Sequence, residues 1–166
     1  MKGIRYAEGL KVLPVLAPVD TTTSAVSSGE VWLREAHWVT FLVNFGNFTS
    51  DSTDVVVITV ESSTGNSTAS TDEAIAFSYR LSAAVDTDSM GAITAATSDG
   101  VTLGATSDDS KCLIIDVDPA YVTAHDTDAQ YVRVVATPSG SVGALLLSAI
   151  AVIEPRYPGN SMNSAT

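Results

Sequence analysis

Short apolar runs, broken by clusters of serine, threonine, aspartate and glycine, recur along the whole chain at intervals of roughly ten to twenty residues. This spacing is typical of β-strands joined by turns, since a strand needs only a short run of apolar residues. Many of the apolar residues are valines, whose branched side chain favours a pleated strand over a helix. A repeat with a fixed period of roughly 20–50 residues is not found, which disfavours a solenoid or a propeller. The pattern predicts an all-β protein.

Two segments carry the clearest strand patterns. In His37–Phe48 the apolar odd positions alternate with mixed even positions, which predicts a strand with one core face and one partly covered face. Asp54–Glu61 has apolar side chains at both odd and even positions, so we expect a central strand covered on both sides. Residues 62–71 are almost wholly serine, threonine, glycine and asparagine, and this composition predicts a loop.

Further elements follow from the same reasoning. Three segments show the same short alternating pattern and predict strands: Ala74–Leu81, Lys111–Val117 and Tyr131–Ala136. The apolar run Ala144–Ile153 predicts a last strand because its end is β-branched, with a short helix as the alternative. Asp118 followed by Pro119 predicts the start of one helical turn, because aspartate caps a helix and proline suits its first position.

The domain organisation is bounded by the length of 166 residues, which fits one domain. Pro14 and Pro18 restrict pairing in a central strand, so residues 1–18 are expected to form an extended N-terminal arm. The small polar residues of segment 158–166 predict a flexible tail. Residues 19–157 are then the folded domain, predicted to be a β-sandwich or jelly roll of about eight strands.

The charge balance excludes several classes of protein. The chain has 8 lysines and arginines against 19 acidic residues, a net charge of -11, and this composition is opposite to that of a nucleic-acid-binding protein. A 45% apolar and 16% charged composition is too rich in core-forming residues for a disordered acidic segment. The longest apolar run, at residues 144–153, is about half of the roughly 20 residues that a membrane-spanning helix needs. We expect neither a membrane span nor, from Met1–Tyr6, an export signal.

Candidate catalytic residues are few. Cys112, His37 and His125 are the residue types of a nucleophilic site, but Cys112 lies in an apolar strand pattern and the chain has no Gly-x-Ser-x-Gly motif. A single cysteine also excludes a disulfide within the chain and a zinc site built from several cysteines. We therefore expect a protein that is not an enzyme and holds no cofactor.

Paired aspartates are the candidate ligands for a hard cation. The pairs are Asp86 and Asp88, Asp108 and Asp109, Asp116 and Asp118, and Asp126 and Asp128. The first or the last pair could hold Ca²⁺ if a third oxygen converged from another loop. None of the pairs has the spacing of an EF-hand, and turns select aspartate because its side chain bonds to the nearby backbone. We expect no bound metal.

Aromatic residues offer an alternative function. A platform for a sugar could be built from Trp32, Trp38, Tyr79, Tyr121 and Tyr131. Trp38 and Tyr79 fall within strand patterns, however, where packing in the core explains them. A carbohydrate-binding β-sandwich therefore stands as an alternative.

Four segments, taken in their order along the chain, resemble those of a known family. They are Trp38–Gly46, Cys112–Ala120, Tyr131–Val134 and Ala149–Tyr157, and the most particular pieces are Ile115–Pro119 and Pro155–Tyr157. Together they resemble the head decoration (capsid cement) proteins of tailed bacteriophages, which are small, acidic, cysteine-poor β proteins. The resemblance extends from Leu13 to Tyr157.

This resemblance implies a non-enzymatic virion protein on the outer surface of a capsid. Its expected partner is the major capsid protein, bound through many weak contacts, and its expected state is a homotrimer made in the host cytoplasm. No cofactor, nucleic acid or membrane is implied. Another virion part, in the tail or the neck, is the nearest alternative.

The proline-containing segment near the N-terminus holds the candidate contact residues. Prolines favour an extended form that can add along the edge of another subunit or of the shell. The alternative is an edge strand folded onto its own domain, because prolines are also common at sheet edges. The candidate capsid or subunit contacts are Leu10, Val12, Leu13, Pro14, Val15, Leu16 and Pro18.

Overall fold

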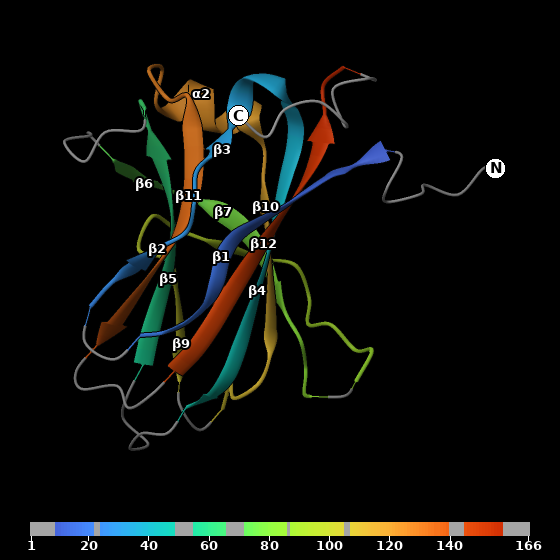
Figure 1. The fold of residues 1–166 in the computed structure, drawn as a ribbon, viewed down its shortest axis with the longest axis vertical. Helices are drawn as coiled ribbons and strands as arrows, with labels where there is room; N and C mark the ends of the chain where they lie inside the picture. The colour runs from blue at the N-terminus through green and yellow to red at the C-terminus, as the bar shows by residue number, and fades with distance from the viewer. Residues whose placement is uncertain are drawn as a thin grey trace.

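The computed structural model describes residues 9–21, 24–48, 55–65, 72–85, 87–104, 107–139 and 145–157, and strands predominate in them (Figure 1). The strands are β1 (Lys11–Asp20), β2 (Val26–Ser27), β3 (Val31–Trp32), β4 (Ala36–Phe48), β5 (Val55–Ser63), β6 (Glu73–Ile75), β7 (Phe77–Leu81), β8 (Thr94–Ala96), β9 (Val101–Gly104), β10 (Cys112–Val117), β11 (Tyr131–Ser139) and β12 (Leu145–Pro155). The helical elements whose full bounds lie in the described residues are the 3-10 turn η1 (Leu33–Glu35) and the helix α2 (Pro119–His125).

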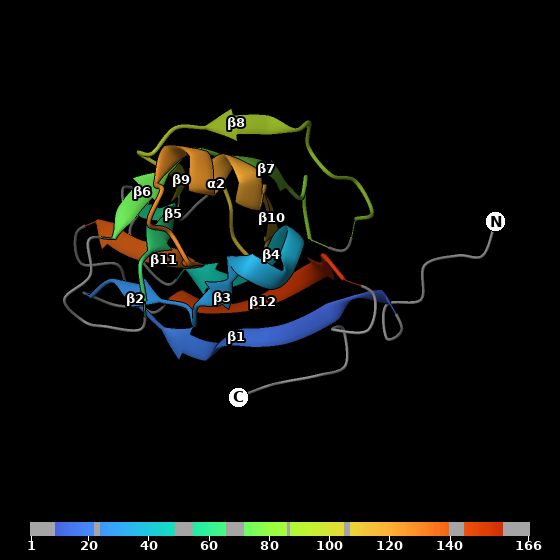
Figure 2. The ribbon, with the colours of Figure 1, turned by 90° about the horizontal axis from the view of Figure 1, so that it is seen from above.

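The strands form two antiparallel sheets. Sheet A has the order β1-β12-β4-β10-β7-β8, and sheet B has the order β2-β11-β5-β6, with β3 also on β11 and β9 also on β5. Seen from above, β1 and β8 lie on opposite sides of the molecule, with β11 and β5 between them (Figure 2). The prediction of an all-β protein is confirmed.

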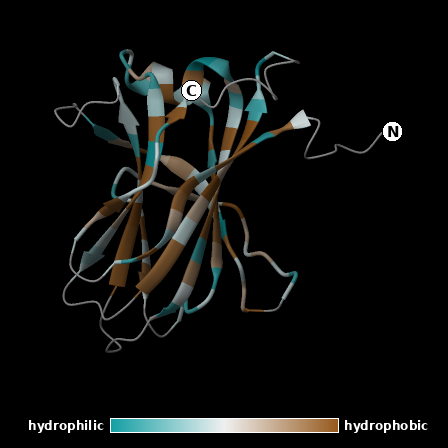
Figure 3. Cartoon of the chain, in the orientation of Figure 1, coloured by the Kyte–Doolittle hydropathy of each residue, from teal (hydrophilic) through white to brown (hydrophobic). Residues whose placement is uncertain are grey.

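One buried core unites residues of both sheets. Alternate residues of β4, among them Phe41 and Val43, are fully buried together with Val56 and Ile58 of β5. Because side chains alternate across a strand, each sheet gives one face to this core and turns the other face outward. Apolar residues accordingly concentrate along the strands (Figure 3).

Most predicted strands are present. Those at β4, β5, β10, β11 and β12 begin within one residue of the predicted position. The apolar run near the C-terminus is a strand, not the alternative helix. The helix start is also confirmed, since the Asp118 carboxylate accepts a hydrogen bond from the Ala120 N–H at 2.8 Å and Pro119 begins α2.

The prediction of a single strand over Ala74–Leu81 is wrong. The segment forms two strands, β6, which pairs with β5 in sheet B, and β7, which pairs with β10 in sheet A. The chain therefore passes from one sheet to the other at Ala76. The alternation of apolar residues continues through this crossing, so periodicity alone does not mark it.

The predicted boundary between an arm and a domain falls inside a strand. Residues 11–20 form β1, which pairs antiparallel with β12, so the described part of the expected arm 1–18 is an edge strand of its own domain. β1 tolerates Pro14 and Pro18 because it has one sheet neighbour and its register shifts between Pro14 and Leu16 and between Leu16 and Val19. Residues 1–8 and the predicted tail 158–166 lie outside the described residues.

Asp108 organises the connection between β9 and β10. Its carboxylate accepts hydrogen bonds from the Gly104 N–H, the Ser107 hydroxyl and the Lys111 ammonium, each at 3.0 Å. Burial by itself raises the pKa of this carboxyl, but the three donors and the positive charge of Lys111 outweigh burial and hold the pKa below its ordinary value. The folded state therefore favours the charged form of Asp108.

Replacing Asp108 by asparagine is expected to lower the free energy of unfolding at pH 7 by about 1 kcal/mol, because the amide gives Lys111 no opposite charge. A depressed folded-state pKa stabilises the protein above the unfolded-state pKa of roughly 3.9, and this contribution is lost as the pH falls toward the folded-state value. Urea unfolding at pH 7 and pH 3 should show the difference between wild type and Asp108→Asn shrinking at the lower pH. The exposed Asp88, replaced by asparagine, is the control. A difference independent of pH would contradict this role.

Candidate functional site

The structure divides the predicted contact residues of β1 into two groups. Leu13, Val15 and Leu16 pack against the core of their own chain, and Leu10 is also half-buried. Val12 is 49% exposed, and Pro14 and Pro18 are exposed as well. Val12, Pro14 and Pro18 are therefore the members of the predicted set that present most surface to another molecule.

The exposed residues of β1 continue into an apolar surface on sheet A. The register places Pro14 beside Ile150, Ile150 beside Leu42, and Leu42 beside Ile114. Two residues along the same two strands, and on the same face, Val12 lies beside Val152. Their neighbours along each strand are core residues, so these side chains point away from the core. We define the outer apolar face as Val12, Pro14, Leu42, Ile114, Ile150 and Val152.

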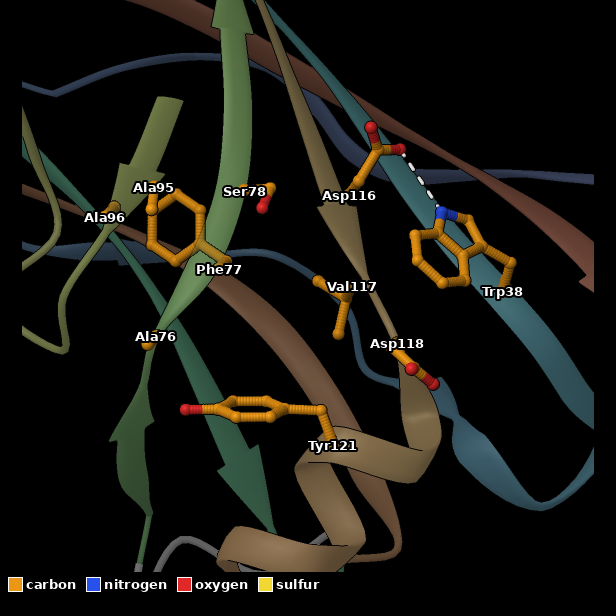
Figure 4. A pocket seen from close by; sticks show the side chains of 10 residues that line it. All are labelled: Trp38, Ala76, Phe77, Ser78, Ala95, Ala96, Asp116, Val117, Asp118 and Tyr121. Carbon is orange, nitrogen blue, oxygen red and sulfur yellow. Dashed lines mark hydrogen bonds between the residues drawn. The ribbon is translucent and has the colours of Figure 1, made fainter. Parts of the chain in front are cut away.

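A concavity of about 280 Å³ lies beside this face, between β4, β7, β8, β10 and α2 (Figure 4). We call it the β4–α2 groove. It is lined by Trp38, Ala76, Phe77, Ser78, Ala95, Ala96, Asp116, Val117, Asp118 and Tyr121. The groove thus brings three aromatic rings, Trp38, Phe77 and Tyr121, and two carboxylates together from distant parts of the sequence.

Trp38, Asp116 and Tyr121, which line the β4–α2 groove, are held in place by contacts within the protein. The Trp38 indole N–H donates to Asp116 Oδ1 at 3.3 Å, and the Thr40 hydroxyl donates to the same oxygen at 2.7 Å. Tyr121 stacks on His125 with a ring-centroid distance of 6.2 Å and an interplanar angle of 6°. Trp38 is nevertheless 38% exposed and Tyr121 47% exposed, so both rings present surface to a ligand.

The other aromatic candidates lie elsewhere. Tyr79 packs against the core and contacts Phe77 with ring centroids 6.3 Å apart. Tyr131 is half-buried on β11, where it pairs with Trp32 of β3. The Trp32 ring carries the Arg34 guanidinium 5.9 Å above its centroid. Trp38 and Tyr121 are thus the two predicted platform residues that the structure brings to one groove.

The candidate nucleophile and histidines do not come together. Cys112 pairs with Asn44, and His37 lies seven residues farther along β4, which is about 23 Å along a strand. His125, at the end of α2, has its Nε2 3.4 Å from the Glu73 carboxylate. Burial raises the pKa of the Cys112 thiol, which disfavours the reactive thiolate. A nucleophile paired with a base is not formed by these residues.

The aspartate pairs that the structure describes take part in hydrogen bonds within the protein. Asp126 accepts from the Ser62 hydroxyl at 2.8 Å and from the Asp128 N–H at 3.1 Å. Asp86 lies outside the described residues. Among the residues whose placement is described, no three histidines, cysteines or acids are grouped so as to hold a metal ion. Asp116 and Asp118, which the sequence suggests only as cation ligands, instead line the groove.

Comparisons of the chain with protein-family models, with curated proteins and with solved structures found no match. Within the described ranges, every helix is too short or too polar to cross a membrane.

Proposed function

We propose that this chain is a non-enzymatic structural protein of a tailed-phage particle, which decorates the outer surface of the capsid and stabilises it through many weak contacts with the major capsid protein. The observation that carries this proposal is the outer apolar face of sheet A, which continues onto the edge strand β1. Two members of this face, Val12 and Pro14, are exposed and the other four are half-buried, and a contiguous set of partly exposed apolar side chains is typical of a contact surface.

The positions of the segments that resemble decoration proteins support the choice of the outer apolar face as the contact surface. Trp38–Gly46 lies in β4, Cys112–Val117 forms β10, and Ala149–Pro155 lies in β12. β12, β4 and β10 are consecutive neighbours in sheet A. Three of the four resembling segments therefore build one sheet, and its outward side is the outer apolar face.

The finer fold that we propose is a jelly roll, a two-sheet arrangement of eight strand positions. Its support is the strand order, β1-β12-β4-β10 in sheet A and β2-β11-β5-β6 in sheet B. β3 and β9 share the positions of β2 and β6, since they pair with the same neighbours, β11 and β5. β7 and β8 then extend sheet A beyond β10.

The mechanism follows from binding linkage. A protein that binds the assembled shell but not its separated subunits shifts the equilibrium toward the intact particle. Contacts of modest strength suffice when one homotrimer engages several sites at once, because the second contact forms at high effective concentration. If the contact surface is apolar, the acidic side chains behind the net charge of -11 face solvent. We therefore expect the affinity for the capsid to change little with salt concentration.

A charged residue in the outer apolar face is expected to weaken capsid binding by about tenfold or more, since burying an unpaired carboxylate costs at least about 1.4 kcal/mol. The variant is Val152→Asp, and the measurement is co-sedimentation with phage heads that lack the protein. The matched control is Val57→Asp, because Val57 is also a half-buried valine in the middle of a sheet, between Thr102 and Thr137 of sheet B.

Circular dichroism and thermal melting of both variants establish that each is folded. The expected result is loss of binding for Val152→Asp and wild-type binding for Val57→Asp. Equal binding of both variants would overturn the choice of surface. If the wild-type protein binds heads neither at low salt nor at high salt, the proposed function itself is overturned.

A further inference from the structure

The β4–α2 groove combines features that the capsid contact does not use. It joins two partly exposed aromatic rings, two carboxylates and a hydroxyl in one concavity. We propose that this groove binds a neutral saccharide, with one pyranose ring held between Trp38 and Tyr121 and its hydroxyls donating to Asp116 and Asp118. This activity goes beyond decoration of a capsid and does not depend on it.

The aromatic rings supply the apolar part of the site. Large aromatic side chains gain free energy by leaving water, yet Trp38 on β4 and Tyr121 on α2 keep 38% and 47% of their surface exposed (Figure 4). The C–H faces of a pyranose ring are flat and apolar, so they can pack on such rings. Because Trp38 is tied to Asp116 and Tyr121 stacks on His125, little side-chain freedom is lost on binding.

The carboxylates supply acceptors for sugar hydroxyls. Both hydrogen bonds to Asp116 end at Oδ1, and the bond from the Ala120 N–H to Asp118 also ends at Oδ1. In the described part of the chain, Oδ2 of each carboxylate accepts no hydrogen bond from the protein, so this oxygen can accept one from a ligand. Hydrogen bonds from hydroxyls to ionised carboxylates are among the stronger ones, and the Ser78 hydroxyl lines the groove beside them.

The charge and size of the groove select the class of sugar. Among the described residues that line the groove there is no lysine or arginine, and two carboxylates repel a sugar that carries a carboxylate, a sulfate or a phosphate. A volume of about 280 Å³ is at the lower end of ligand pockets and suits one ring more than a buried chain. A neutral monosaccharide or the terminal residue of a neutral glycan meets both conditions.

The test is saturation-transfer NMR and isothermal titration of the purified protein, in the absence of capsids, with glucose, galactose, mannose, N-acetylglucosamine and their oligomers. The expected result is binding of at least one of these neutral sugars and a loss of affinity of about tenfold or more in Trp38→Ala. The matched control is Trp32→Ala, because Trp32 is 41% exposed and lies outside the β4–α2 groove. It should bind as the wild type does.

A second variant, Asp116→Asn, keeps the shape of the side chain and removes the charge, so it tests the carboxylate even if Trp38→Ala is unstable. We expect it to weaken binding at unchanged thermal stability. Absence of binding by the wild type, equal loss in Trp32→Ala, or a preference for uronic or sialic acids would overturn the proposal. None of these outcomes bears on capsid binding, which is measured separately.

Discussion

Replacing Phe41 by alanine is expected to lower the free energy of unfolding by about 3–5 kcal/mol. Phe41 is fully buried at the centre of β4, where it pairs with Ile115 on one side and Ala151 on the other. It thus belongs to the middle of sheet A and to the core that both sheets share. The loss combines the transfer of a large apolar side chain with the cavity left behind, because the neighbouring strands are too constrained to collapse into it.

Urea unfolding at pH 7, followed by tryptophan fluorescence and circular dichroism, measures this effect. Phe41→Leu is the matched control, since a smaller change in buried volume is expected to cost roughly 1–2 kcal/mol. A loss of less than about 1 kcal/mol in Phe41→Ala would contradict the position of this residue in the shared core.

Replacing Gly100 by alanine is expected to destabilise the protein by about 2–5 kcal/mol, for two separate reasons. Gly100 has a φ of +83°, which an L-residue adopts with strain. A Cβ there would also lie 2.3 Å from the Ile58 carbonyl oxygen, in the middle of β5. Gly100 immediately precedes β9, so relief of this contact would disturb the pairing of β9 with β5.

The control for Gly100→Ala is Gly65→Ala, because a Cβ at Gly65 meets no atom within 4 Å. Gly65→Ala should change the unfolding midpoint little, whereas Gly100→Ala should shift it strongly. Equal midpoints for the two variants would contradict the close contact between Gly100, which precedes β9, and the Ile58 carbonyl of β5.

The long strands were predictable from two different signals. β4 carries a long alternation of residue types in the sequence, whereas β12 is an apolar run whose β-branched end favours a strand over a helix. β8 and β9, of three and four residues, are too short to carry a period that stands out from a loop. The prolines of β1 offered an edge strand as an alternative, but its pairing partner β12 is more than a hundred residues away, and no local pattern encodes that pairing.

The groove was predictable only in part. The sequence singles out Trp38 and Tyr121 as aromatic candidates, whereas it suggests Asp116 and Asp118 only as cation ligands. One further signal is the spacing of these two aspartates: residues two apart in an extended chain share a face, and Asp118, directly after β10, keeps an extended backbone. That this side meets Trp38 is fixed by the pairing of β10 with β4, and Tyr121 arrives through the turn of α2. Both contacts depend on tertiary structure, which the local sequence does not encode.

The most direct test of the decoration proposal is the position of the protein on purified phage particles that carry it. Antibody labelling in the electron microscope, with the copy number counted against the major capsid protein, measures this position. We predict dense labelling over the whole head at a copy number comparable to that of the shell. Labelling confined to the tail or neck, or no labelling of particles at all, would contradict the proposal.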